Sequence, residues 1–196
     1  MKRPISVALI AAAVLLTGCI DPATENAPAA ADVTSPYVGM ESRDIKALSD
    51  AQVDEYLTGN GMGFALVAEL NRYPGPRHAL DAAEQLDLTD AQLPQVRALF
   101  DQMLADAVAL GEQIVEKEAQ LDALFADARA TEPEVDSLIA GIGDLNAQLR
   151  FVHVRTHLEM KKLLTPEQVD QYNAVRGYDD EGGEDHVHQE GMEHGA

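Results

Sequence analysis

Two long stretches of the chain repeat apolar residues every seven positions. The first runs from about Asp90 to Ala128. One heptad position holds Leu93, Phe100, Ala107, Ile114 and Leu121, and the other holds Val96, Met103, Leu110 and Leu124, with Lys117 interrupting it. A seven-residue apolar repeat is typical of a helix that buries a narrow seam against another helix. The spacing therefore predicts one long helix over this stretch.

The second long stretch begins at Thr131, where Thr131 and Glu134 match the T-x-x-E pattern of a helix-starting capping box. One heptad position then holds Val135, Ile142, Leu149 and Leu163 with a polar Thr156, and the other holds Leu138, Leu145 and Val152. Two helices of this length joined by a short turn are expected to pack as an antiparallel hairpin.

The segment before the hairpin predicts shorter helices that cover it. Residues 62–73 are rich in apolar side chains, and Pro74-Gly75-Pro76 should end that helix sharply. A short helix from about Arg77 to Leu86 is expected next. No stretch alternates clearly enough to be a strand, so the fold class is all-α. Because a hairpin has little core of its own, a remaining apolar stripe favours a homodimer.

One short phrase occurs three times, at irregular spacing. In each copy a hydroxyl residue precedes glutamine by three positions and follows a leucine: Leu48-Ser49-x-x-Gln52, Leu88-Thr89-x-x-Gln92 and Leu164-Thr165-x-x-Gln168. This is the capping box, in which the hydroxyl accepts from one backbone amide and the glutamine bonds back to another. The three copies predict three helix N-termini.

The two ends of the chain do not resemble folded structure. Residues 1–18 have a basic start and a short apolar run, as in an export signal. They end in Leu16-Thr17-Gly18-Cys19, which resembles a bacterial lipobox, so Cys19 is expected to carry lipid; an ordinary export signal is the alternative. Residues 19–44 read as a disordered tether, 45–178 as the helical domain, and 179–196 as a disordered acidic tail. Since Ile20 follows the cysteine, the outer membrane is favoured.

The charge of the chain excludes one class of partner. The formal net charge is −20, and loss of residues 1–18 would leave 12 basic against 34 acidic residues, or −22. Nucleic acid is a poor partner for such a surface, because phosphate contacts need lysine and arginine. The glycines of Gly59-Asn60-Gly61-Met62-Gly63 have neither a preceding strand nor a following Lys-Ser/Thr, and indicate a helix boundary or close packing. No residue pattern supports catalysis.

The histidines suggest metal binding. His153 and His157 lie four apart on a predicted helix, with Met160 three further on, so one helix face presents two imidazoles and a thioether. Another ligand, with His78 as a candidate, would have to come from elsewhere. The alternative is that both histidines flank the apolar seam and Met160 lies in the core. The tail holds His186, His188 and His194 among acidic residues, a composition that binds Zn²⁺, Ni²⁺ or Cu²⁺ weakly.

Two of the three phrases, Leu88-Thr89-x-x-Gln92 and Leu164-Thr165-x-x-Gln168, resemble the paired LTxxQ motifs of the Spy/CpxP superfamily of periplasmic helical proteins. The resemblance covers roughly residues 45–178, and MGFALVAELNRYPGPRHALDAAEQLDLTDAQ resembles a lipoprotein branch related to periplasmic heavy-metal sensors. It implies a cradle-shaped dimer and either ATP-independent chaperoning or a response to envelope stress or metal. The acidic charge departs from the basic concave face typical of the chaperones.

Three functions follow as hypotheses. The leading one is a non-enzymatic, lipid-anchored periplasmic chaperone or metal-responsive module that acts on unfolded client proteins and requires no cofactor. The alternative is a sensor or buffer in heavy-metal resistance that binds Zn, Ni or Cu through His153, His157 and Met160. The third is a structural lipoprotein whose helices mediate assembly.

Overall fold

The computed structural model describes residues 34–179. Within that range the chain is helical without strands, which confirms the predicted fold class. The expected signal peptide, Cys19 and the tail histidines lie outside the described residues. The elements in order are η1 (Met40–Ser42), α1 (Asp50–Leu57), α2 (Leu66–Glu69), α3 (Pro76–Asp81), α4 (Leu93–Ala126), α5 (Glu132–Leu163) and α6 (Pro166–Val175).

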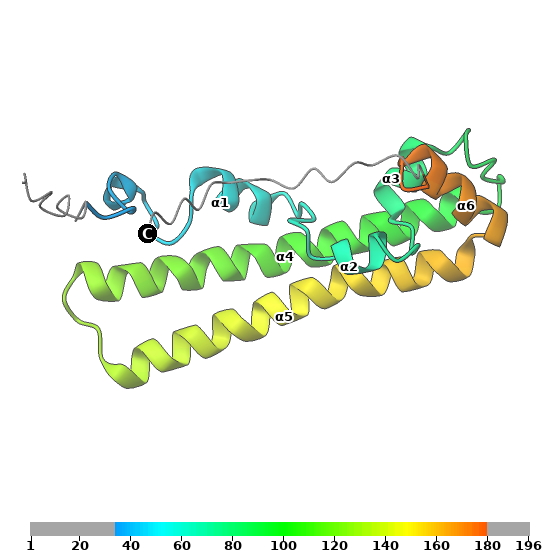
Figure 1. The fold of residues 1–196 in the computed structure, drawn as a ribbon. Coiled ribbons are helices and arrows are strands. Elements are labelled where there is room, and N and C mark those ends of the chain that lie inside the picture. Colours follow the sequence, from blue (N-terminus) through cyan, green and yellow to red (C-terminus); the bar gives the residue numbers. More distant parts are fainter. Residues whose placement is uncertain (1–33, 180–196) are drawn as a thin grey trace, which may run out of the picture. The chain divides into compact units, whose positions relative to one another are not determined.

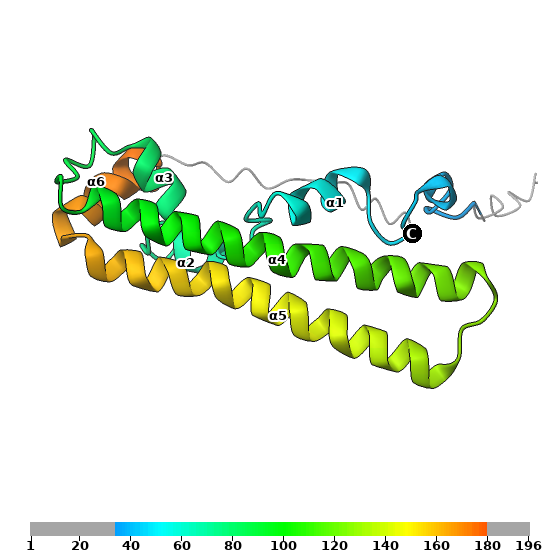
Figure 2. The same ribbon diagram turned by 180° about the vertical axis from the view of Figure 1, so that it is seen from behind.

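The long helices α4 and α5 run antiparallel and side by side (Figures 1 and 2). Their predicted seams face each other. Ala107 and Ile114 of α4 form one buried cluster with Leu145 and Leu149 of α5. The seven-residue spacing therefore marked the contact surface of the hairpin correctly.

Burial along the hairpin is uneven. A second cluster joins the hairpin to α3 and α6, and it consists of Ala79, Ala82, Leu86, Val96, Met160, Leu164, Val169 and Tyr172. Between residues 115 and 144, around the turn that joins α4 to α5, no residue is buried. Phe125 and Ile139 are 62% and 55% exposed there. The short helices thus complete the core at one end of the hairpin only.

The helix α1 packs closely on α4 at a glycine. A side chain built at Gly111 would place its first carbon 2.1 Å from the carbonyl oxygen of Tyr56, so only glycine fits there. The Tyr56 hydroxyl donates to the Asn146 side-chain oxygen at 3.2 Å and so links α1 to α5. Gly59 follows α1 with φ +68° beside Leu104, as expected of a glycine at a helix boundary with close packing.

The covering helix expected over residues 62–73 is only one turn long. Met62, Gly63 and Arg72 have φ of +42°, +72° and +65°, which helical backbone does not allow, so only α2 remains between them. Leu66, Val67 and Leu70 are more than half exposed instead of covering the hairpin. The apolar pattern was therefore wrong about both the length of this helix and the burial of these three residues.

Three other boundaries differ from the expected ones. The helix predicted from Arg77 to Leu86 ends at Asp81, and Asp87 takes a positive φ of +46°. The helix expected from about Asp90 to Ala128 is α4, which begins at Leu93 after a turn at residues 89–92 and ends two residues early. Helix ends commonly shift in this way, because a tight first or last turn loses the regular α-helical bonding.

Thr131 begins α5 as predicted, but its capping box does not form. Its hydroxyl donates to the Glu134 carboxylate instead of accepting from a backbone amide.

Within residues 34–179, none of the helices combines the length and the apolar character that crossing a bilayer requires.

Candidate functional site

The three repeated phrases all form capping boxes. The amides of Gln52, Gln92 and Gln168 donate to the preceding hydroxyl oxygens at 3.3, 3.2 and 3.2 Å. Each glutamine side chain accepts in return from the backbone amide of its hydroxyl residue. The boxes begin α1, the turn that leads into α4, and α6. The predicted N-termini of α1 and α6 are confirmed, whereas the Thr89 box lies one turn before α4, which begins at Leu93.

Two of the capping glutamines also bond to each other across the fold. Gln92 Nε2 donates to Gln168 Oε1 at 2.8 Å, and Gln168 Nε2 donates to Gln92 Oε1 at 3.0 Å. Gln92 further donates to the carbonyl of Leu163 at 3.1 Å, and Gln168 to that of Leu86 at 3.2 Å. The amide pair therefore holds together the start of α4, the end of α5, the start of α6 and the loop after α3.

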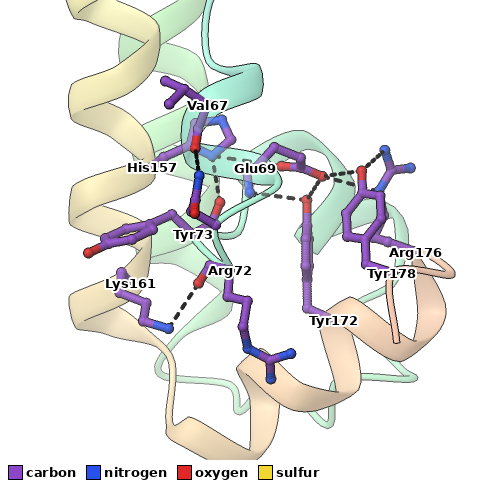
Figure 3. Close-up of polar contacts among 11 residues, drawn as sticks. Val67, Glu69, Arg72, Tyr73, His157, Lys161, Tyr172, Arg176 and Tyr178 are labelled. Carbon is purple, nitrogen blue, oxygen red and sulfur yellow. Dashed lines mark hydrogen bonds and ion pairs between the residues drawn. The ribbon is translucent and has the colours of Figure 1, made fainter. Parts of the chain in front are cut away.

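The segment that joins α1 to α3, residues 58–75, lies along α5 and is called the strap below. The carbonyl of Tyr73 lies 2.7 Å from His157 Nδ1, and the carbonyl of Arg72 accepts from Lys161 Nζ at 2.9 Å (Figure 3). Since a carbonyl only accepts, His157 Nδ1 carries the proton of that bond. In the neutral ring His157 Nε2 then keeps its lone pair.

A buried carboxylate ties the strap to α6. Glu69, 7% exposed, accepts at Oε1 from the Tyr172 hydroxyl at 2.7 Å, from Arg176 Nε at 3.2 Å and from the Tyr178 hydroxyl at 3.1 Å (Figure 3). The Tyr172 hydroxyl also accepts from the amide of Gly75 at 3.1 Å. Burial raises the pKa of Tyr172 far above its usual range, so its hydroxyl stays a donor. The strap and the C-terminal helix are thereby held together.

The strap borders an open cavity of about 730 Å³ that α3, α4 and α5 also line. Its polar and sulfur-bearing lining includes Glu69, His78, Met103, His153, His157 and Tyr178. His153 is 3% exposed and stacks on Phe64, and its Nε2 atom is buried without a hydrogen-bond partner. A buried polar atom without a partner costs about 1–3 kcal/mol, so this nitrogen is suited to bind a ligand.

The absence of a side chain at Gly75 leaves space beside the second histidine. The position that a side-chain carbon would take there lies 3.2 Å from His157 Nε2 and 3.4 Å from Glu69 Oε2. Any larger residue would press on the imidazole ring. Glycine at position 75 therefore lets the strap lie close against the His157 ring.

Of the residues predicted to bind metal, the structure brings two together. His153 and His157 both line the cavity, whereas Met160 is fully buried in the core cluster with Leu86 and Tyr172. His78 lines the same cavity. Across residues 34–179, however, histidine, cysteine and acidic residues form no group of three placed to hold a metal ion.

Sequence reasoning missed Glu69 as a site residue. It was the one acidic residue in the apolar run of 62–73, and that lone charge could have marked it. Its partners Tyr172 and Arg176 lie more than a hundred residues away along the chain, so no local spacing connects them.

The titration of His153 gives the first testable prediction. Burial, reinforced by the neighbouring His157, lowers the pKa of His153 below its ordinary 6.5. As the pH drops below 6.5, His153 becomes protonated in the unfolded chain but stays neutral in the folded chain. The free energy of unfolding therefore falls as the pH drops from 6.5 towards the folded pKa. We expect His153→Gln to reduce the stability lost between pH 7 and pH 5, measured by urea unfolding. Burial also lowers the pKa of His78, but His78 is present in both the parent protein and His153→Gln. Equal losses of stability in the two proteins would contradict the prediction.

A second surface feature lies on α2 of the strap, where Leu66 also lines the cavity. Leu66, Val67 and Leu70 of α2 and its C-terminal end are 54%, 56% and 58% exposed; these three residues are called the α2 patch. Single exposed apolar residues are ordinary, but neighbouring ones on one face indicate a contact surface.

These features define a class of protein: a long helical hairpin whose ends are joined by paired capping glutamines. The LTXXQ motif family protein model matches residues 77–176, so the chain belongs to the LTXXQ motif family, as the Spy/CpxP resemblance predicted. No curated protein and no solved structure matches the chain. Proteins of this family are typically periplasmic and generally not enzymes. The relation to lipoproteins and heavy-metal sensors stays a prediction.

Proposed function

We propose that this protein is a periplasmic, ATP-independent chaperone of the Spy/CpxP type, anchored through lipid on Cys19 to the outer membrane and active in envelope stress. The α2 patch carries this proposal, because it presents three large apolar side chains to solvent. Burial of apolar surface contributes about 25 cal/mol per Å², so such a patch favours contact with exposed apolar segments of a client.

The charges of the hairpin favour apolar over electrostatic contact with clients. Basic residues of α5 form ion pairs with acidic residues of the same molecule: Arg155 lies 3.4 Å from Asp106, and Lys162 lies 2.8 Å from Glu159. Lys161 donates to the strap. A net charge of −20 leaves little attraction for acidic clients, so apolar surface is the better basis for binding.

Suppression of client aggregation tests this function. We expect the protein, in several-fold excess and without ATP, to reduce light scattering by a client diluted from denaturant. Leu66→Ser, Val67→Ser and Leu70→Ser combined should remove most of this effect, because they replace exposed side chains without opening the core. The matched control is Phe125→Ser with Ile139→Ser, which changes equally exposed residues at the hairpin turn. No suppression by the parent protein would refute the function.

A second candidate function is binding of one divalent metal ion, Zn²⁺, Ni²⁺ or Cu²⁺, at the cavity. The buried, unpartnered His153 Nε2 favours it, together with the Nε2 lone pair of His157 beside Gly75. The hydrogen bond from His157 Nδ1 to the Tyr73 carbonyl orients the ring, as outer hydrogen bonds do for metal-binding histidines.

Substitution distinguishes the ligands of this second function. We expect His157→Gln to weaken Zn²⁺ binding at least about tenfold in calorimetric titration. Met160→Leu should leave the affinity unchanged, because that thioether packs in the core. Both proteins would carry Cys19→Ser, which removes the single thiol of the chain. Unchanged affinity in His157→Gln, with its fold intact, would refute the site.

A further inference from the structure

The cavity beside the strap is lined by uncharged donor groups that include two thioethers. The imidazoles of His153 and His157 come from α5, and His153 Nε2 is buried without a hydrogen-bond partner. The side chains of Met103, on α4, and Met62, on the strap, line the same cavity. Three separate parts of the chain therefore bring two imidazoles and two thioethers to one cavity.

The backbone at Met62 adopts a conformation that is rare for methionine. Its φ is +42°, in the left-handed region that is unfavourable for any residue with a side chain. Residues kept in such conformations cluster at binding and catalytic sites, where the surrounding structure maintains them. Met62 lies between Gly61 and Gly63, so a thioether is the one side chain that this three-residue segment brings to the cavity.

The ligands that a buried divalent ion needs are not assembled at this cavity. Across residues 34–179, histidine, cysteine and acidic residues form no group of three placed to hold a metal ion. Glu69 already accepts three hydrogen bonds at Oε1. Zn²⁺ in a closed protein site takes four ligands, and the cost of burying an ion rises with its charge. A singly charged ion that accepts fewer ligands fits these residues better.

We propose that the cavity binds monovalent copper, Cu(I), through His153, His157 and the thioether of Met103. Met62 supplies a further sulfur atom from the strap. The proposal rests on the cavity site of the second candidate function and changes the metal that this site takes. Thioether ligands are suited to Cu(I), and imidazole binds copper as well. The carboxylate of Glu69, whose Oε2 lies 3.7 Å from His157 Nδ1, places negative charge near the ion.

Replacement of a thioether tests the proposal. Cu(I), kept reduced with ascorbate in the absence of oxygen, would be titrated into the full chain in competition with the chromogenic chelator bathocuproine disulfonate. We expect Met103→Leu to weaken Cu(I) binding at least about tenfold, since even the loss of an outer hydrogen-bond partner costs about 10–100-fold. X-ray absorption should show that Cu(I) in this variant has lost a sulfur neighbour. Zn²⁺ binding should stay unchanged.

Met160→Leu is the matched control. Met160 is fully buried in the core cluster and does not line the cavity, so the same chemical change there should leave Cu(I) binding unaltered. Leucine and methionine have similar volumes, so both variants should keep the fold. Met62→Leu, on the strap, is a second test should Met103→Leu prove unstable, and a loss in the same direction is expected. All proteins carry Cys19→Ser.

The other outcomes separate the proposal from the function on which it rests. Zn²⁺ bound more tightly than Cu(I), and weakened by His157→Gln, would refute the proposal and keep the divalent site. Cu(I) affinity unchanged in both Met103→Leu and Met62→Leu would exclude the thioethers as ligands and overturn the proposal. If His157→Gln changes the binding of neither metal, both the proposal and the second candidate function fail. Cu(I) binding that depends on Met103, without Zn²⁺ binding, would support the proposal and refute the divalent function.

Discussion

Gly111→Ala is expected to destabilise the protein by about 2–3 kcal/mol, although alanine is the better helix former by about 1 kcal/mol. The new methyl carbon would lie 2.1 Å from the backbone oxygen of Tyr56, and a backbone atom cannot rotate away. The helix α1 must therefore move off α4. That movement would also disturb Tyr56, which packs against the Ile114 cluster and donates to Asn146.

Gly143→Ala is the matched control for this prediction. Gly143 lies within α5, and a side chain there would meet no atom within 4 Å. The same chemical change should therefore stabilise the protein, by up to about 1 kcal/mol from helix propensity. Thermal and urea unfolding of both variants would measure the difference, and hydrogen exchange would show loosening of α1 in Gly111→Ala. Equal effects of the two substitutions would contradict the packing argument.

Gln168→Ala is expected to cost about 3 kcal/mol, the second large effect. Gln168 is 7% exposed, and its amide serves the backbone of Thr165, the carbonyl of Leu86 and the side chain of Gln92. Truncation of Gln168 leaves these groups without hydrogen-bond partners in a buried site. Each buried group without a partner lowers the free energy of unfolding by about 1–3 kcal/mol. Loss of the α6 cap alone would account for only about 1 kcal/mol.

Gln52→Ala separates the capping effect from the cross-link. Gln52 completes the same box before α1, but it is exposed, and its side-chain bonds remain within that box. We expect a loss of about 1 kcal/mol or less, measured by urea unfolding. A double-mutant cycle between Gln92 and Gln168 should show strong coupling, since each removes the other's partner. Additive losses would show that the amide pair contributes nothing beyond two caps.

Some features of this protein follow from local sequence alone. The heptad spacing of α4 and α5 specifies which face of each helix is apolar, and burial of Ala107, Ile114 and Leu149 agrees with it. The capping boxes at Ser49, Thr89 and Thr165 depend on residues only three positions apart, so the local sequence was enough to predict them. The family relationship likewise follows from sequence, through the match of residues 77–176.

Other features depend on residues that are distant in the chain. The sequence predicted a helix over 62–73, but positive φ angles at Met62, Gly63 and Arg72 confine it to one turn. The strap instead follows contacts made by Glu69 and His157 with other helices. Local helix propensity is worth less than 1 kcal/mol for each ordinary residue, so tertiary contacts override it.

For the functional residues, the sequence determined which side chains are candidates, and the tertiary structure determined their contacts. The sequence alone identified His153 and His157 as a pair on one helix face, and Gln92 and Gln168 as caps. Tertiary structure alone decided that Met160 belongs to the core, that Glu69 binds α6, and that the two glutamines bond to each other. The physical reason is that helical spacing determines which residues share a face, whereas burial and partners arise when separate helices pack.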